Sequence, residues 1–269
     1  VARNMAGSMR FAFGASLGFS FMHLGRLAVL QQHVSAPSDV VVSAVPGPSQ
    51  LRGGPYMQRQ ANVRLLALSL ADKSLEWYCV NDIVMGGRSS SFLKRTASGS
   101  LHFSGTISTQ GGGFASCRSA QEPRAVPEEA TGVRLKISGA PTHAFKLTLS
   151  GGTRVEGEVG CENDTRGFIQ RWIGMDPDQQ MRLLQSVTWQ CPIPLDAEIK
   201  AGPRDVFLPF ANFRPSLFGQ KLTGLALDHR IVNHIGLNVG IFDMDGQRDS
   251  RYGDGPFELE LHAVDFSQE

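Results

Sequence analysis

Residues 77–119 combine the residue types and the spacing that could form a binding site. Asn81 and Asp82 precede a glycine pair at 86–87, and a second glycine run follows at 111–113. Short polar side chains of this kind accept hydrogen bonds from nearby backbone amides and fix the conformation of a loop. We therefore expect Asn81 and Asp82 to brace a loop. The alternative is that the loop binds a ligand, because binding residues concentrate in loops on rigid scaffolds.

The two glycine runs predict tight turns rather than a phosphate-binding loop. Residues 111–113 lack the lysine and the Ser or Thr that complete a P-loop. Residues 86–87 lack the full dinucleotide-binding fingerprint. Glycine permits positive φ and close backbone approach, which explains both runs without a ligand. We therefore predict no cofactor.

Arg118 lies near the end of the same segment, and we expect it to pair with Asp82 or to cap a backbone carbonyl. If the segment contacts a partner directly, the contact surface is expected over 85–89 and 112–116. The candidate residues of this surface are Asn81, Asp82, Met85, Gly86, Gly87, Ser89, Gly112, Gly113, Phe114, Ser116 and Arg118.

Acidic residues gather nearer the C-terminus, at Asp243, Asp245 and Asp249. They resemble part of a calcium-binding loop but lack the complete EF-hand spacing and its closing glutamate. Acidic turns are more common as solvated surface than as metal sites. We therefore predict no metal, with calcium at these three residues as the alternative.

The remaining nucleophiles, bases and metal ligands form no complete set. The four cysteines contain no C-x-x-C pair, which argues against structural zinc and favours reduced, buried thiols. A Cys79–Cys117 or a Cys161–Cys191 disulfide is the alternative. The histidines show no H-x-H or H-x-x-x-H spacing, and no G-x-S-x-G elbow is present. We predict that the protein is not an enzyme, although a triad assembled in space would leave no such motif.

The elements that must position these residues are predominantly strands. Period-two alternation marks four segments: 133–137, 145–149, 235–241 and 257–261. Gly, Pro, Asn and Asp separate them, as expected of turns. The pattern predicts an all-β antiparallel sandwich or jelly roll over residues 72–269. Only 178–187 has a helical pattern.

Composition and aromatic content narrow the function classes. A formal net charge of +1 over 269 residues argues against a dedicated nucleic-acid binder, whose domain is usually basic. Three tryptophans and two phenylalanines are expected to fill the core, with a sugar-binding groove as the alternative. They are Trp77, Trp172, Trp189, Phe114 and Phe210.

Residues 1–71 differ in character from the rest. They carry six arginines but a single acid, Asp39, among many Ser, Ala, Pro and Gly residues. An acid-poor, arginine-rich leader is typical of an organelle transit peptide. An apolar patch at 11–22 followed by 34–70 would suit a bipartite plastid leader, and a mitochondrial presequence fits equally well. The alternative is a disordered or membrane-surface tail that is retained.

Several ordered motifs are similar to those of the complex I intermediate-associated protein 30 family. Trp77 followed by Val80-Asn81-Asp82-Ile83-Val84-Met85-Gly86-Gly87 and Ser89 resembles its W…V-N-D-x-V-M-G-G-x-S opening. Later elements also fit: Phe103-Ser104-Gly105, Gly112-Gly113-Phe114-Ala115-Ser116-Cys117-Arg118, Phe207-Leu208-Pro209-Phe210-Ala211-Asn212-Phe213, Ile235-Gly236-Leu237 and Gly255-Pro256-Phe257-Glu258-Leu259-Glu260-Leu261. The resemblance covers about residues 74–266.

The resemblance implies a galactose-binding-like β-sandwich and an assembly factor rather than an enzyme. Family members help to build respiratory complex I in mitochondria, and related domains occur in plastid and bacterial proteins. The implied partners are protein subunits of a membrane-complex assembly intermediate, with peripheral membrane association compatible and nucleic acid excluded. A plastid photosystem assembly factor and a carbohydrate-binding module are the alternatives.

The sequence departs from the family pattern in two places. Gln110 and Gly111 stand where asparagines often precede G-G-F, which weakens a ligand role for side chains there. Residues 156–187 have the character of an insertion, and we expect it to offer a partner surface specific to this protein.

Overall fold

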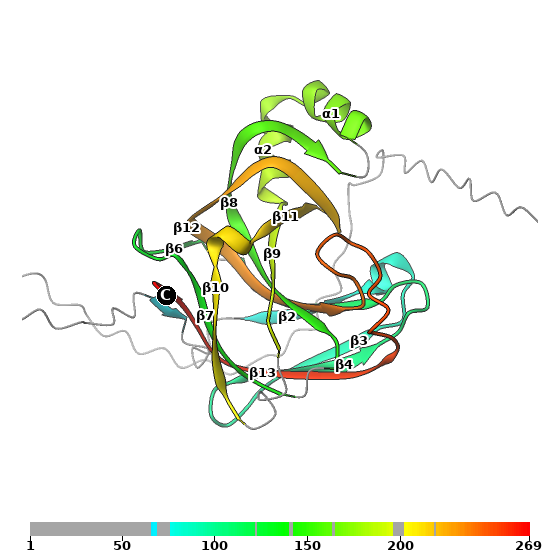
Figure 1. Ribbon diagram of the computed structural model, residues 1–269, viewed down its shortest axis with the longest axis vertical. Coiled ribbons are helices and arrows are strands. Elements are labelled where there is room, and N and C mark those ends of the chain that lie inside the picture. Colours follow the sequence, from blue (N-terminus) through cyan, green and yellow to red (C-terminus); the bar gives the residue numbers. More distant parts are fainter. Residues whose placement is uncertain are drawn as a thin grey trace, which may run out of the picture. The chain divides into compact units, whose positions relative to one another are not determined.

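The computed structural model describes residues 66–68, 76–121, 123–139, 142–162, 165–195, 202–217 and 219–269. These residues form two antiparallel sheets that pack against each other (Figure 1). The first sheet has the order β10-β7-β13-β4-β3, with β1 beside β13. Its strands are β1 (Leu66–Leu68), β3 (Ser90–Arg95), β4 (Leu101–Ile107), β7 (Gly132–Ser138), β10 (Arg204–Pro209) and β13 (Gly255–Ser267).

The second sheet has the order β11-β9-β8-β12-β5-β2, with β6 beside β12. Its strands are β2 (Trp77–Asn81), β5 (Phe114–Ser119), β6 (Arg124–Ala125), β8 (Ala144–Cys161), β9 (Thr188–Pro192), β11 (Arg214–Leu217) and β12 (Gln220–Gly240). All pairings between the described strands are antiparallel. The all-β sandwich predicted from the sequence is confirmed.

The alternating segments place their apolar residues between the two sheets. Along β7, Val133, Leu135 and Ile137 have no exposed surface, whereas Lys136 is exposed to solvent. The same alternation in the neighbouring strands builds one continuous core, and burial of this apolar area is the main force that holds the sheets together. Trp189 is buried, and Trp77 and Trp172 pack partly buried against the core. The tryptophans therefore serve packing, as the core interpretation predicted.

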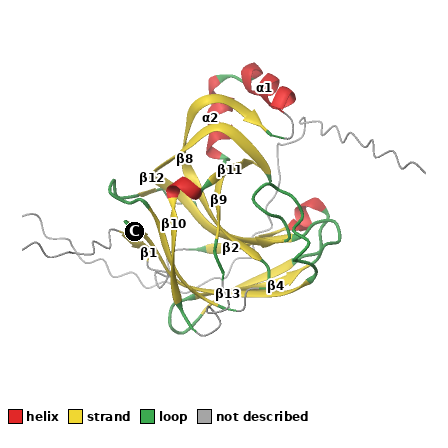
Figure 2. Ribbon diagram, in the orientation of Figure 1, coloured by secondary structure: helices red, strands yellow, loops and turns green. Residues whose placement is uncertain are grey.

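Two helices, α1 (Thr165–Gly174) and α2 (Pro177–Gln185), connect β8 to β9 (Figure 2). The sequence pattern predicted only one helix, at 178–187, so α1 was missed. The start of α2 is fixed by a capping box, in which Asp176 accepts a hydrogen bond from the backbone of Gln179 while the Gln179 side chain accepts one in return. Phe168, only 6% exposed, anchors α1 to the core.

The sandwich begins earlier than the sequence analysis placed it. Strand β1 lies within the segment assigned to the leader, yet it pairs with β13 through the register Leu66↔Phe266 to Leu68↔Val264. Residues 66–68 therefore pair with the sandwich although they precede the boundary predicted at residue 72. The rest of that segment, 1–65 and 69–71, lies outside the described residues. None of the helices described here has the length and apolarity needed to span a membrane.

Candidate functional site

A buried carboxylate organises the segment that the sequence singled out. A short 3-10 helix, η2 (Asp82–Met85), follows β2, and its first residue, Asp82, is fully buried. Asp82 Oδ1 accepts a hydrogen bond from Ser89 N at 2.9 Å, and Oδ2 accepts one from Ser89 Oγ at 2.7 Å. Oδ2 also accepts hydrogen bonds from the backbone amides of Gly113, at 2.7 Å, and Phe114, at 3.3 Å. These bonds offset the cost of burying the carboxylate and confirm that Asp82 braces the loop.

The glycines around Asp82 are required by its position. A Cβ atom at Gly87 would lie 2.2 Å from Asp82 Cγ, and one at Gly112 would lie 2.2 Å from Asp82 Oδ2. Gly86 ends η2 with φ of 86°, a left-handed conformation that favours glycine. The glycines therefore allow the two loops to close over one carboxylate. We call Asp82, Gly87, Ser89, Gly112 and Gly113 the Asp82 brace.

Two other predicted members of the network have different roles. Asn81 Oδ1 accepts a hydrogen bond from Ser91 Oγ at 2.6 Å, which ties β2 to β3. Arg118 does not pair with Asp82, so that expectation is wrong. Its guanidinium carbon lies 5.9 Å from the centre of the Tyr78 ring. The reason is strand alternation: Cys117 next to it faces the core, so the Arg118 side chain points to the opposite face of the sheet.

The predicted contact surface divides into a buried part and an exposed part. The Asp82 brace is largely buried, and Ser116 is only 8% exposed. Met85 is 70% exposed, and Ile83, which the sequence analysis did not select, is 63% exposed. We call Ile83, Met85 and Gly86 the η2 surface. Its signal in the sequence was weak, because apolar residues beside a strand normally predict burial.

Contacts with neighbouring loops fix the η2 segment further. Gly113 O accepts a hydrogen bond from Ile241 N at 3.1 Å, which joins the glycine loop to the connection between β12 and β13. In the same connection, Asp254 Oδ1 accepts a hydrogen bond from Thr109 N at 2.7 Å. The η2 surface, the glycine loop and residues 241–254 therefore lie at one end of the sandwich.

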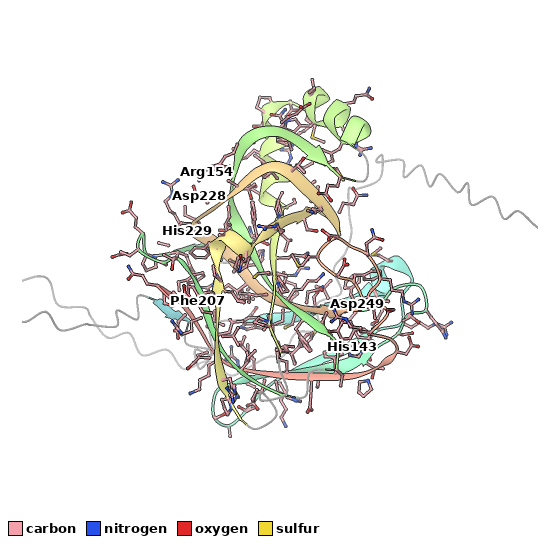
Figure 3. All side chains as sticks on the ribbon, in the orientation of Figure 1. His143, Arg154, Phe207, Asp228, His229 and Asp249 are labelled. Atoms are coloured by element: carbon pink, nitrogen blue, oxygen red, sulfur yellow. The ribbon has the colours of Figure 1, made fainter. Side chains whose placement is uncertain are left out.

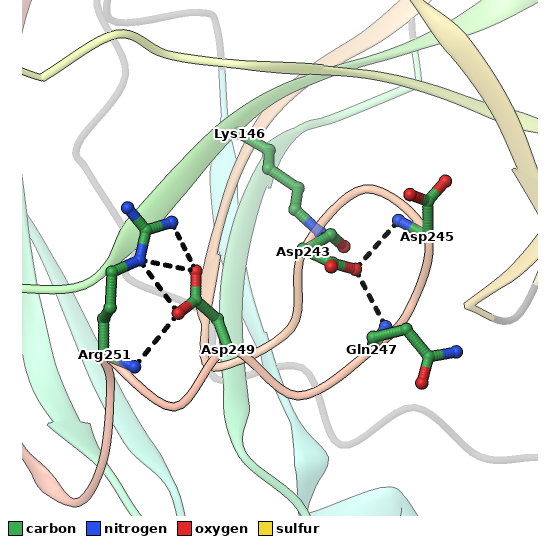
Figure 4. A network of polar contacts seen from close by, with 6 residues as sticks. All are labelled: Lys146, Asp243, Asp245, Gln247, Asp249 and Arg251. Atoms are coloured by element: carbon green, nitrogen blue, oxygen red, sulfur yellow. Dashed lines mark hydrogen bonds and ion pairs between the residues drawn. The ribbon is translucent and has the colours of Figure 1, made fainter.

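A pocket of about 200 Å³ lies between the start of β8, the end of β9 and the connection from β12 to β13. His143, Lys146, Asp243, Asp249 and Tyr252 are among its lining residues. Lys146 is only 7% exposed, and its Nζ donates a hydrogen bond to Asp243 O at 2.7 Å (Figure 4). Burial lowers the pKa of Lys146, while the nearby Asp243 carboxylate opposes this shift. The pocket therefore offers a desolvated amine beside the stacked rings of His143 and Tyr252.

The three acidic residues of the calcium alternative do not converge. The Asp243 carboxylate accepts backbone hydrogen bonds from Asp245 and Gln247, which shapes the turn (Figure 4). Asp245 pairs with Lys221, and Asp249 with Arg251. Hydrogen bonds from Arg251 lower the pKa of Asp249 to about 2. Among the described residues, no group of three His, Cys, Asp or Glu side chains could hold a metal ion. The three carboxylates therefore shape the turn and form ion pairs with Lys221 and Arg251.

A second polar group lies away from this pocket, and Figure 3 shows Arg154, Asp228 and His229 apart from His143 and Asp249. Hydrogen bonds from Arg230 lower the pKa of Asp228 to about 2. The His229 ring stacks on Phe210, with centroids 4.4 Å apart. Burial lowers the pKa of His229. The group packs the F-A-N-F turn against β12 and presents no nucleophile.

One serine–histidine contact resembles part of a hydrolase triad. Ser138 Oγ lies 2.8 Å from His262 Nε2, but Glu260 Oε1 is 4.0 Å from His262 Nδ1, beyond hydrogen-bond range. The same Glu260 oxygen accepts a short hydrogen bond from Ser100 Oγ. Ser138 also lies at the end of the β7 ladder rather than on a sharp turn. The contact therefore supplies no oriented third member to activate the serine.

The chain matches a known protein family over a range that includes the Asp82 brace. The family described as Complex I intermediate-associated protein 30 matches residues 67–261. Among curated proteins, none matches the chain. Within the matched range, the motif from Val80 to Ser89 forms the end of β2, η2 and three members of the Asp82 brace, which are Asp82, Gly87 and Ser89. The G-G-F-A-S motif at 112–116 supplies the other two, Gly112 and Gly113.

Several solved structures are similar to the chain at low sequence identity. The chain is similar to the family 11 carbohydrate-binding module of the cellulosomal cellulase Lic26A-Cel5E of Clostridium thermocellum, at 15% identity and a TM-score of 0.43, over 76% of this chain and 95% of that chain. A family 11 module from Clostridium thermocellum in complex with a β-1,3-1,4-mixed-linked tetrasaccharide is similar at 13% identity and a TM-score of 0.40, over 73% of this chain and 90% of that chain. The agarase AgWH50C is similar at 9% identity and a TM-score of 0.36, over 75% of this chain and 24% of that chain. At these levels of similarity, none of them assigns a ligand to this chain.

The match to the family spans most of the chain, and the motifs that carry it are the residues that build the Asp82 brace. The chain therefore belongs to the complex I intermediate-associated protein 30 family.

Proposed function

We propose that the protein is a non-catalytic assembly factor that binds an assembly intermediate of an organellar membrane complex, most specifically mitochondrial respiratory complex I. The observation that carries the proposal is the η2 surface. Ile83 and Met85 are 63% and 70% exposed, although the backbone that bears them is fixed by the buried Asp82 carboxylate. Family membership supplies the class of partner.

The physical argument rests on preorganisation. Exposed apolar side chains on a mobile loop lose conformational entropy when a partner orders them, which weakens binding. Here the Asp82 brace has already fixed the loop, so apolar area on the η2 surface can be buried at low entropic cost. Methionine and isoleucine side chains suit a protein partner, because neither carries a group that orients a polar small molecule.

The test compares a double substitution on the η2 surface with a single control substitution at another exposed apolar residue. We expect Ile83→Asp combined with Met85→Asp to reduce recovery of complex I subunits by at least about tenfold when tagged full-length protein is purified from organelle membranes. Ile231→Asp is the control, because Ile231 is 52% exposed on β12. Both proteins should unfold at the same temperature as the unmodified chain. Equal recovery of complex I subunits from the η2 variant and the control would overturn the proposal.

The compartment is tested separately, because residues 1–65 and 69–71 of the leader lie outside the described residues. Residues 1–71 fused to a fluorescent protein are expected to direct it to mitochondria. Plastid import would favour the alternative of photosystem assembly, in which the same η2 surface would meet a different membrane complex.

A carbohydrate-binding role is the second candidate, and the pocket beside Lys146 is the observation that favours it. The pocket combines an aromatic ring at Tyr252 with polar groups at Asp249 and Arg251. Rings and planar polar groups are what sugar sites use for stacking and for hydrogen bonding to hydroxyl groups. Glycan-array binding that is lost in Tyr252→Ala would support this candidate, and an array without any bound glycan would remove it.

A further inference from the structure

Two cysteines face each other across the strands that flank the η2 segment. Cys79 on β2 lies directly opposite Cys117 on β5. Antiparallel pairs alternate between hydrogen-bonded and non-hydrogen-bonded positions, and only the second kind brings the side chains close. The phase of the ladder therefore decides whether the two sulfur atoms can meet.

The hydrogen bonds at the end of the ladder give this phase. Ala120 N donates to Glu76 O at 2.7 Å, and these two residues continue the register of the Cys79–Cys117 pair. The Cys79–Cys117 pair lies three positions further along the ladder than the hydrogen-bonded pair of Glu76 and Ala120. Because the two kinds of pair alternate at every position, Cys79 and Cys117 form a non-hydrogen-bonded pair. The pairing of β5 with β12 leads to the same conclusion. Ile241 N donates to Gly113 O, and the Leu237–Cys117 pair lies four positions further along this ladder, so it is also a hydrogen-bonded pair. The backbone N–H and C=O of Cys117 therefore point toward β12 and away from β2.

The geometry at such a position suits a disulfide. Opposite Cα atoms lie about 4.5 Å apart at non-hydrogen-bonded positions, within the range of about 4.4–6.8 Å that disulfides span. Both thiols are free in this structure and both side chains face the core. Cys117 is buried, whereas Cys79 on the edge strand is partly accessible. A small oxidant can therefore reach one thiol of the pair but not the other.

The other two cysteines are not placed to compete. Cys191 on β9 lies opposite Leu147, near the start of β8, whereas Cys161 lies at the far end of β8, opposite Leu222. The Cys161–Cys191 disulfide considered from the sequence is therefore wrong. Cys161 Sγ instead donates a hydrogen bond to Gln220.

We propose that Cys79 and Cys117 form a thiol–disulfide exchange site for low-molecular-weight disulfides of the glutathione class. The Cys79 thiolate attacks one sulfur of the oxidised disulfide, which forms a mixed disulfide and releases one thiol. The Cys117 thiolate then attacks Cys79 Sγ, which closes the intramolecular bond and releases the second thiol. Two protein thiols are oxidised and one small disulfide is reduced to two thiols, so atoms and electrons balance.

Formation of this disulfide would affect the η2 surface. The exchange reaction itself does not depend on the proposed function. The bond would close a covalent ring over residues 79–117, which contains η2, β3, β4 and the whole Asp82 brace. Cross-linking the ends of this segment restricts its unfolded states. Oxidation is therefore expected to stabilise the end of the sandwich that carries Ile83 and Met85.

The rate of exchange should be slow at neutral pH and rise with pH. Burial raises the pKa of both Cys79 and Cys117, and a hydrogen bond with Ser91 partly offsets this for Cys79. The thiolate is the attacking species, so a raised pKa leaves less of it at neutral pH.

The test uses two complementary double variants of the full chain. Cys161→Ala with Cys191→Ala retains the proposed pair, and Cys79→Ala with Cys117→Ala removes it. After incubation with excess oxidised glutathione at pH 8, each protein is denatured, alkylated and weighed by mass spectrometry. We expect the first variant to lose both free thiols without adding glutathione, and the second to keep both. Dithiothreitol should restore the thiols and lower the melting temperature again.

The unmodified chain provides a check that needs no variant to fold. Peptide mapping of the oxidised, non-reduced protein should give one linked peptide pair, containing Cys79 and Cys117. Two alkylated thiols in the pair-retaining variant would overturn the proposal. Glutathione that remains on Cys79, or a link between two different chains, would also overturn it.

Discussion

The Asp82 carboxylate takes hydrogen bonds from Ser89 and from the backbone of Gly113, so its removal should affect the whole loop end. Asp82→Ala leaves the buried amides of Ser89 and Gly113 without this acceptor, and we expect the free energy of unfolding to fall by about 2–4 kcal/mol. Urea denaturation measures the change, with Asp205→Ala at an exposed position as the control. An unchanged unfolding midpoint with lost partner recovery would instead mean that Asp82 acts in binding.

A second prediction concerns the glycines of the brace. In Gly112→Ala the added Cβ would lie 2.2 Å from the Asp82 carboxylate, so either the carboxylate or the loop must move. We expect a loss of about 1–3 kcal/mol, as for other overpacked sites. Gly174→Ala is the matched control, because a Cβ there meets nothing within 4 Å and Gly174 lies in α1. Equal thermal unfolding of the two variants would show that the brace tolerates displacement.

The sequence predicted the local part of this site but not its long-range part. Asp82 and its glycines could be assigned to a braced loop, because Asp near glycine is a short-range turn signal. The hydrogen bond from Gly113 N to the Asp82 carboxylate joins residues that are 31 positions apart, and no local sequence pattern specifies such a contact. The Arg118 prediction failed because it considered charge without strand alternation. Ile83 was missed for a different reason, because the exposure of an apolar residue in a short 3-10 helix depends on tertiary packing.

Among the elements, strands were predicted more reliably than helices. Period-two alternation located β7, β8, β12 and β13, because each has one face in the core. Helix α1 was missed because its neighbours supply much of its stability. Phe168 packs into the core, whereas Ile173 remains 73% exposed, so the apolar pattern of this short helix is weak.

The connection between β12 and β13 gives a pH-dependent prediction. Asp249 has a pKa of about 2 in the folded protein, below its ordinary value of 3.8, because Arg251 donates hydrogen bonds to it. Its contribution to stability is therefore present above about pH 4 and is lost as the pH falls toward 2. Asp249→Asn should destabilise the protein at pH 6, and the difference from the unmodified chain should shrink as the pH falls from about 4 through about 2.

Thermal unfolding over this pH range measures the effect of Asp249→Asn. Gln247→Ala in the same turn is the control, because it removes no titratable group and its effect should not follow this pH profile. A deficit of Asp249→Asn that persists undiminished at pH 2 would contradict the assigned ion pair with Arg251.

At the scale of the whole molecule, strand β1 decides where the folded unit begins, although the composition of its surroundings predicted a leader. Residues 66–68 lie in an arginine-rich, acid-poor segment, yet β1 pairs with Val264 to Phe266 of β13. Strand β13 also pairs with β4 and β7, so β1 extends the ladder at the point where β4 has ended. The match to the family likewise begins at residue 67. We therefore expect β1 to belong to the cooperative fold.

Two truncated chains test this boundary. A chain of residues 61–269 retains β1, and a chain of residues 76–269 removes it. The shorter chain loses the backbone hydrogen bonds of a three-residue strand and leaves one edge of β13 unpaired at 264–266, while β7 still pairs with the other edge, so we expect its free energy of unfolding to be lower by about 1–3 kcal/mol. Amide hydrogen exchange should also become faster within 264–266, at the residues whose N–H groups face β1 rather than β7. Equal stability and equal exchange would place the start of the folded unit after β1, so that β1 could be removed together with the leader without loss.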